Sequence, residues 1–379
     1  MTHEEQHKVA EELLKAGDYA AAEATAREIL AKESNDTITI AHAHNILSES
    51  LFRRGLFQEA LPHAEQALSL AEQEQSKELQ GKALNTIGLV YWNLSDNPKA
   101  LECYAKALAI MEELGNKEGI AINLGNIGNV YNNLSDYPKA LEYYVKALAL
   151  DEELGGKSGI ANKLGNIGVV YRNLLDYPKA LEYYSKALAL YEELGNKGGI
   201  AINLGNIGIV YGLLSDYPKA LEYYASALAL NEELGNKDGI ARNLGNIGLM
   251  YLDIPDYSKA LENLAKSLSL NEELGRKGGI ARNLGNIGLV YADEKFDGFD
   301  FALTEEYLLK AIALLEEIGA KQDLYENQRN LAELYEKQKR WKKFAVHYKK
   351  YHEIYLEVQS EEATKQAQNM EHRRKIEEA

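Results

Sequence analysis

Cysteine is almost absent from this chain of 379 residues, which contains only Cys103. A single cysteine excludes an intramolecular disulfide and any zinc site built from several cysteines. Cys103 occupies a position that later, similar segments fill with tyrosine. We therefore expect this thiol to pack among its neighbours rather than to react.

Histidine is missing from the whole middle of the chain. His42 and His44 stand two residues apart, which places them on different faces of a helix, so we expect packing rather than metal binding. The sequence shows no set of nucleophile, base and metal ligands. We expect no enzymatic activity, no cofactor and no metal. The eight histidines are His3, His7, His42, His44, His63, His347, His352 and His372.

Long apolar runs and an excess of positive charge are lacking as well. Residues 1–14 carry acidic side chains where a signal peptide has cationic ones, and no later run approaches the length of a membrane span. The net charge is -16, whereas nucleic acids and anionic membranes attract clustered cations. We therefore expect a cytoplasmic protein that binds neither nucleic acid nor membrane.

An exact internal repeat dominates what is present. The motif LGNIG recurs every forty residues, and a second motif, DYPKALEYY, is complete three times at the same interval. Such regularity indicates stacked copies of one structural unit. LGNIG begins at Leu124, Leu164, Leu204, Leu244 and Leu284, and DYPKALEYY begins at Asp136, Asp176 and Asp216.

Each copy predicts two helices, which we call helix A and helix B. In the clearest copy helix A spans about residues 119–134 and helix B about 138–154. Asp136 is placed to cap helix B, with a proline in its first turn. Gly155 suits the left-handed conformation that follows a last helical turn. Each repeat therefore closes as a helical hairpin.

One side of each helix is apolar at helical spacing. A lone hairpin cannot cover these surfaces, whereas stacked copies bury them continuously. The glycines within LGNIG lie inside helix A, so we expect close helix packing and not a phosphate-binding loop. The packed side is formed by Leu124, Ile127, Gly128 and Tyr131 in helix A and by Ala140, Leu141, Tyr144, Ala147, Leu148 and Leu150 in helix B.

These residues resemble the tetratricopeptide repeat family, in the forty-residue form found in kinesin light chains, Leu-Gly-Asn-rich polarity adaptors and bacterial peptide-sensing regulators. The resemblance implies an all-α fold, a right-handed α-solenoid of about nine hairpins plus a C-terminal helix. The family pattern is carried here by Leu124, Ile127, Gly128, Tyr131, Ala140, Tyr144 and Ala147.

The repeats suggest four segments. Residues 1–36 form a degenerate capping hairpin, 37–320 the tandem repeats, 321–356 a C-terminal repeat and 357–379 a connecting helix. An insertion at residues 292–301 should bulge out of one turn. Leu356, Ala363 and Met370 recur every seven residues in the last segment, and stopping mid-pattern suggests a piece of a longer protein.

The opposite side of helix A carries a polar stripe, represented by Ile122, Asn126, Asn129 and Asn133 in one repeat. By the resemblance, this stripe lines the concave groove and meets a ligand. An amide pairs with both the N–H and the C=O of a peptide backbone. The alternative is that the amides bond neighbouring repeats. The recurring members are Asn126, Asn166, Asn206, Asn246, Asn286 and Asn330.

The stripe changes character along the chain. Ile202, Ile209 and Leu213 make it apolar in one repeat, and Arg242 and Arg282 follow in the next two. Such a groove suits an apolar anchor and a nearby carboxylate. Asp253 and Asp293 provide an alternative, since they are candidate ion-pair partners of the arginines. The lysine used by the two-carboxylate clamp of chaperone-binding relatives is replaced by Gly125, so the resemblance does not extend to that specificity.

The sequence therefore predicts a scaffold that binds a protein or an extended peptide. It suits the sensory part of a bacterial signalling protein whose output domain lies beyond Ala379. The alternatives are a receptor for a peptide pheromone and a module that assembles into homo-oligomers.

Overall fold

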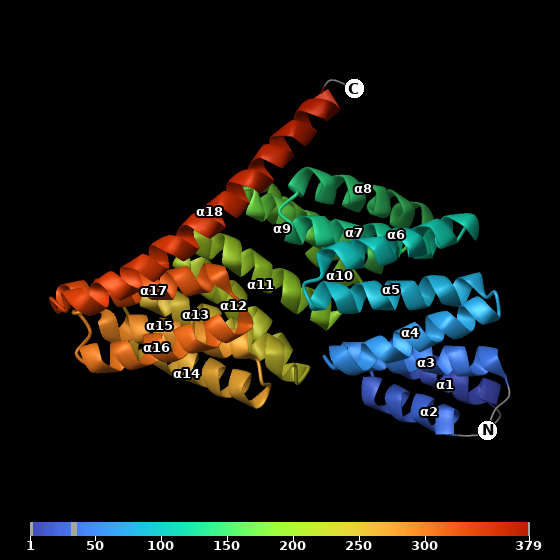
Figure 1. Cartoon of the computed structure of the whole chain (residues 1–379), viewed down its shortest axis with the longest axis horizontal. Coiled ribbons are helices and arrows are strands. Elements are labelled where there is room, and N and C mark those ends of the chain that lie inside the picture. Colours follow the sequence, from blue (N-terminus) through green and yellow to red (C-terminus); the bar gives the residue numbers. More distant parts are fainter. Residues whose placement is uncertain (1–2, 32–35, 378–379) are drawn as a thin grey trace. The chain divides into compact units, whose positions relative to one another are not determined.

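The computed structural model describes residues 3–31 and 36–377, and for residues 361–377 it describes the backbone alone. Within these residues the chain forms 18 α-helices and no β-strand, which confirms the predicted all-α fold (Figure 1). The helices alternate as predicted between helix A and helix B of successive hairpins. None of the helices within the described residues is both long and apolar enough to cross a lipid bilayer.

Within the described part of the chain the helices alternate between A and B, and in eight hairpins the A helix packs against the B helix that follows it. The A helices are α1 (His3–Ala16), α3 (Thr37–Arg53), α5 (Lys77–Asn93), α7 (Lys117–Asn133), α9 (Lys157–Asn173), α11 (Lys197–Leu213), α13 (Lys237–Asp253), α15 (Lys277–Ala292) and α17 (Lys321–Lys337). The B helices are α2 (Tyr19–Ala31), α4 (Phe57–Gln73), α6 (Asn97–Glu113), α8 (Tyr137–Leu154), α10 (Tyr177–Glu193), α12 (Tyr217–Glu233), α14 (Tyr257–Glu273), α16 (Phe301–Ile318) and α18 (Trp341–Glu377).

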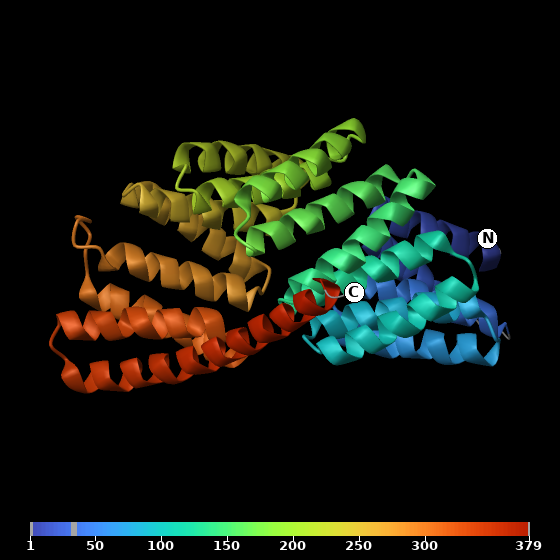
Figure 2. The same ribbon diagram turned by 90° about the horizontal axis from the view of Figure 1, so that it is seen from above.

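The chain divides into two compact units, one ending at Val170 and the other beginning at Tyr171. In the first unit the A helices contact one another in the order α1, α3, α5, α7. In the second unit α11, α13, α15 and α17 do the same. Figure 2 shows α15, α16, α17 and α18 lying side by side at the C-terminal end of the second unit. Each unit is thus a stack of hairpins.

The predicted helix ends are confirmed in the clearest copy. The side chain of Asp136 accepts a hydrogen bond from the backbone N–H of Lys139, as an N-cap does. Gly155 ends α8 with φ 69°, a left-handed conformation that favours glycine. Gly128 is required for another reason, because a Cβ there would lie 2.7 Å from Cε1 of the buried Tyr144 ring. The glycines of LGNIG therefore serve helix packing.

The turn from helix A to helix B also uses the left-handed conformation, but without glycine in several repeats. Ser135 and Ser215 adopt φ 59° there, and Leu175 adopts φ 62°. Leu175 is 70% exposed, so its side chain gains little from packing to offset the backbone strain.

We expect Leu175→Gly to raise the free energy of unfolding by about 0.5–1 kcal/mol. The left-handed conformation costs leucine about 1–2 kcal/mol, which glycine does not incur. About half of this gain is lost because glycine has more conformational freedom in the unfolded chain. Urea denaturation measures the change. Leu214→Gly is the matched control: this exposed leucine has φ -82°, so the substitution should lower stability. A loss of stability in both variants would contradict the strain at Leu175.

The insertion between α15 and α16, where a local bulge was expected, contacts α14 and α15 through Phe296 and Asp293. The Phe296 ring packs 5.3 Å from the ring of Tyr257 and 5.8 Å from that of Tyr291. Asp293 accepts a hydrogen bond of 2.7 Å from the Tyr257 hydroxyl. Glu294, Lys295 and Asp297 are exposed, so the local bulge stays a prediction, with Phe296 as its apolar contact to these helices.

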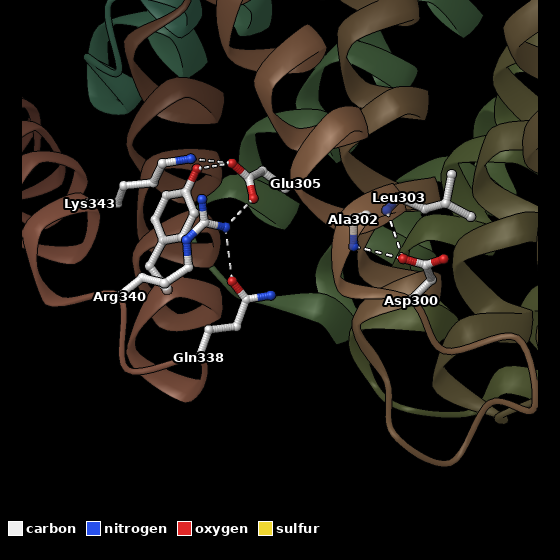
Figure 3. Close-up of polar contacts among 8 residues, drawn as sticks. Asp300, Ala302, Leu303, Glu305, Gln338, Arg340 and Lys343 are labelled. Carbon is white, nitrogen blue, oxygen red and sulfur yellow. Dashed lines mark hydrogen bonds and ion pairs between the residues drawn. The ribbon is translucent and has the colours of Figure 1, made fainter.

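The carboxylate of Glu305 on α16 binds three side chains of the last hairpin (Figure 3). Its Oε1 accepts hydrogen bonds of 2.8 Å from the Tyr335 hydroxyl and 2.7 Å from Lys343 Nζ, and Arg340 binds Oε2. Burial alone raises the pKa of Glu305, but the hydrogen bonds outweigh it and lower the pKa to about 2. Glu305 therefore stays ionised between its cations.

Helix α18 continues without a break from the last hairpin to Glu377. The proposed connecting segment 357–379 thus begins inside this helix. Leu356 is 53% exposed. The seven-residue pattern of Ala363 and Met370 lies outside the residues whose side chains are described.

Candidate functional site

In the first unit, two stripe asparagines hydrogen-bond to the preceding repeat. Asn126 Nδ2 donates to Asn85 Oδ1 at 2.8 Å, and Asn166 Nδ2 donates to Asn129 Oδ1 at 3.2 Å. Asn129 also accepts from the Tyr144 hydroxyl at 2.7 Å. These contacts are those of the alternative interpretation, in which the amides fix one repeat against the next.

In the second unit the stripe is arranged differently. Asn206, Asn246 and Asn286 are half-buried. None of the three side chains has a hydrogen bond to another described residue, and each of them lines a cavity. The two amides nearest the arginines line a cavity of about 310 Å³ together with Arg242 and Arg282. Its walls are α13 and α15, and α14 contributes its floor.

A smaller cavity of about 40 Å³ adjoins this one between α11 and α13. It is lined by Ile202, Asn206 and Ile209, and it shares Arg242 and Asn246 with the larger cavity. The apolar part of the predicted groove and its arginine part are therefore neighbours. This continuity is the main geometric support for a groove along α11, α13 and α15.

Some of the predicted site residues are not brought to these cavities. Leu213 is 54% exposed and lies outside both linings. Asn330 is half-buried on α17 and also lies outside them. Asn126 and Asn166 belong to the first unit. The assignment of a binding role to any of these residues stays a prediction.

The predicted ion pairs of the two arginines are wrong. Arg242 approaches Asp238 at 3.6 Å, and Arg282 approaches Asp323 at 3.8 Å. Of the two acids that were expected, Asp293 is bonded by Tyr257, which lowers the pKa of its carboxyl, and burial raises the pKa of Asp253. Asp238 lies one turn before Arg242 on α13, and Asp323 lies in the first turn of α17, at positions that the stripe pattern did not include.

Sequence reasoning also missed a third arginine in the larger cavity. Arg276 Nε lies 3.5 Å from Asp238 Oδ1, so one carboxylate stands between two guanidinium groups. Arg276 occupies a turn position that is asparagine or glycine in the preceding repeats, at Asn116, Gly156, Asn196 and Asn236. This replacement of asparagine or glycine by arginine was the feature of the sequence that could have indicated the third arginine.

The floor of the larger cavity is tied together by hydrogen bonds. Ser267 Oγ donates to the carbonyl of Ala241 at 2.6 Å and accepts from Asn283 Nδ2 at 2.9 Å. Asn271 Nδ2 donates to the Ser267 carbonyl at 2.9 Å. These bonds hold the polar floor in place before any ligand arrives, which reduces the entropy lost on binding.

The histidines form two separate pairs in the first two hairpins. His44 Nδ1 lies 3.0 Å from His63 Nδ1, and His42 packs against His7 with ring centroids 5.7 Å apart. The different partners show that His42 and His44 face different ways, as their spacing predicts. Burial lowers the pKa of His44 to about 4, so this pair is neutral at pH 7.

Solved structures of similar fold include three whose chains match nearly end to end. A Rap protein complexed with competence and sporulation factor is 17% identical with a TM-score of 0.70, covering 95% of this chain and 100% of that one. Aspartyl phosphate phosphatase F from Bacillus subtilis is 15% identical, with a TM-score of 0.61 and coverage of 93% and 94%. The Rap conjugation gene regulator of plasmid pLS20, in complex with the Phr* peptide, is 13% identical, with a TM-score of 0.60 and coverage of 93% and 95%. At these identities the likeness shows the fold.

Sequence comparison identifies the repeat itself. No curated protein matches the chain. A family model described as tetratricopeptide repeat matches residues 36–113, 79–153 and 159–233, slightly more than half of the chain. The matched segments contain the hairpins whose caps and glycine contacts are described above. The chain therefore belongs to the tetratricopeptide repeat family.

Proposed function

We propose that this protein binds an extended peptide along α11, α13 and α15 of its second unit. The observation that carries the proposal is the pair of adjoining cavities, which share Arg242 and Asn246. Asn206, Asn246 and Asn286 recur every forty residues along this path. Their amides match the alternating donors and acceptors of a peptide backbone and accept any side-chain sequence.

We propose that the protein is a regulator and not an enzyme. One protein of similar fold is a gene regulator in complex with a peptide. Another is an aspartyl phosphate phosphatase, but 15% identity gives no ground for carrying that activity over. We propose that this chain acts as a cytoplasmic sensory module of a signalling protein. A peptide-pheromone receptor and assembly into homo-oligomers remain the alternative hypotheses.

A retention experiment tests the peptide site. The immobilised chain is exposed to a pool of random heptapeptides, and the retained peptides are counted by mass spectrometry. We expect Asn206→Ala with Asn246→Ala to reduce retention about tenfold, since two backbone-pairing amides at about 0.5–1.5 kcal/mol each are lost.

The matched control is Asn126→Ala with Asn166→Ala, which removes the same side chains from the first unit. We expect this variant to retain the pool as well as the unaltered chain does. Equal retention by the second-unit variant and the unaltered chain would remove α11 and α13 from the binding site.

A further inference from the structure

The larger cavity of the second unit concentrates positive charge in an acidic protein. Arg242, Arg276 and Arg282 all line it, and they are three of the four arginines within residues 77–320. Repeats that lack the cavity's charge carry isoleucine or asparagine at the positions of Arg242 and Arg282, as at Ile122, Asn162 and Ile202. The positive charge is therefore specific to this cavity and is not a feature of every repeat.

A carboxylate already stands between two of these arginines. Asp238 Oδ2 lies 3.6 Å from Arg242, and its Oδ1 lies 3.5 Å from Arg276. Both distances exceed that of a direct charge-assisted hydrogen bond, which is about 2.7–2.9 Å. Asp238 is about half exposed, so these pairs contribute little to stability. Asp238 thus partly neutralises both guanidinium groups but forms no direct charge-assisted hydrogen bond with either.

We propose that this cavity binds a carboxylate of the peptide ligand and that Asp238 competes with it for Arg242 and Arg276. The inference rests on the proposed peptide site. A carboxylate that enters the cavity forms direct bonds with the guanidinium groups, and the amides of Asn246 and Asn286 stand beside it. Asp238 sets a minimum strength of binding, because a ligand carboxylate is retained only if it binds the arginines more strongly than Asp238 does.

The position of the cavity also orients the ligand. The neighbouring smaller cavity presents Ile202 and Ile209, and three positive side chains lie on its other side. An extended peptide therefore lies with an apolar residue over α11 and with its carboxylate between α13 and α15. Two sources supply such a group: the C-terminal α-carboxylate and the side chain of aspartate or glutamate.

Three heptapeptide pools separate these sources. The first has random sequences with free C-termini, the second is the same pool amidated, and the third is amidated and lacks aspartate and glutamate. We expect the unaltered chain to retain the first or the second pool about tenfold better than the third, the ratio expected for one buried charge-assisted contact. If the first pool alone is retained better than the third, the ligand group is the C-terminal carboxylate. If the first and the second pools are both retained better than the third, the group is an acidic side chain.

Variants of the full chain then locate the contact. Arg276→Gln and Arg282→Gln should each remove most of the preference for acid, whereas Arg329→Gln, an exposed arginine outside the cavity, should leave it unchanged. Asp238→Asn should increase retention of the acidic pools about threefold or more, because it removes the internal competitor. A gain confined to the acidic pools distinguishes this effect from misfolding, because exposed apolar surface would retain all three pools better.

Equal retention of the third pool and the other two, or an acid preference that survives both arginine substitutions, would overturn the carboxylate site and leave the peptide site standing. A decrease on Asp238→Asn would overturn the competitor. If the unaltered chain retains no pool better than the Asn206→Ala, Asn246→Ala variant does, the peptide site and the carboxylate site fall together.

Discussion

Lys163→Met is expected to lower the free energy of unfolding by about 3 kcal/mol, since it leaves a largely buried carboxylate without its cation. Lys163 Nζ lies 3.5 Å from Asp151 Oδ2, and both side chains are only 11% exposed. No described residue donates a hydrogen bond to this oxygen. Methionine retains most of the lysine stem that lies against Gly125, so the effect reports the charge and not the lost volume. Urea denaturation at pH 7 measures it.

The chain itself supplies the control for this prediction. Eighty residues further on, the same two positions are Asn231 and Asn243. Asp151→Asn with Lys163→Asn should therefore recover most of the stability lost by Lys163→Met, because no charge is left without a partner. A Lys163→Met protein as stable as the unaltered one would show that the Asp151 carboxylate is hydrated in the folded state.

Glu305→Gln is expected to lower stability by about 2 kcal/mol at pH 7, since Arg340 and Lys343 lose the negative charge of their acceptor and one of its two oxygens. The last hairpin should open first, and hydrogen exchange of the α17 and α18 amides would show it. Glu306→Gln is the matched control, because Glu306 forms an exposed pair with Lys310 that is worth about 0.5 kcal/mol or less.

The effect of Glu305 depends on pH in a defined direction. The pKa of Glu305 is about 2 in the folded protein, below its ordinary value of 4.5. The unfolded chain therefore binds this proton first as the pH falls, and the stabilisation is complete above about pH 4.5 and lost towards pH 2. The difference between the unaltered chain and Glu305→Gln should shrink over that range. A difference that stays constant from pH 7 to pH 3 would contradict the role assigned to Glu305.

The hairpins and their ends could be predicted because their causes are local. Asp136 caps the helix that starts beside it, and Gly155 ends the same helix nineteen residues later. The forty-residue interval then extends this one solution along the chain. The insertion at residues 292–301 was harder, because the packing of Phe296 against Tyr257 depends on a side chain of the previous hairpin.

The candidate site could be predicted only in part. Helical geometry alone places Asn246 and Arg242 on one face, and both residues line the larger cavity. The partner of Arg242 was missed, because Asp238 lies one turn away on the same helix and only the folded chain brings Arg276 to its other side. Helix B was treated as packing surface, so the polar floor formed by Ser267 and Asn271 was missed as well.

The two units differ in how their A helices are held to one another. In the first unit, hydrogen bonds between side-chain amides, such as Asn126 to Asn85, join consecutive repeats, and each contributes about 1 kcal/mol to stability. Among the described residues, Asn206, Asn246 and Asn286 form no such bonds across α11, α13 and α15. We therefore expect the angles between neighbouring hairpins to vary more in the second unit than in the first.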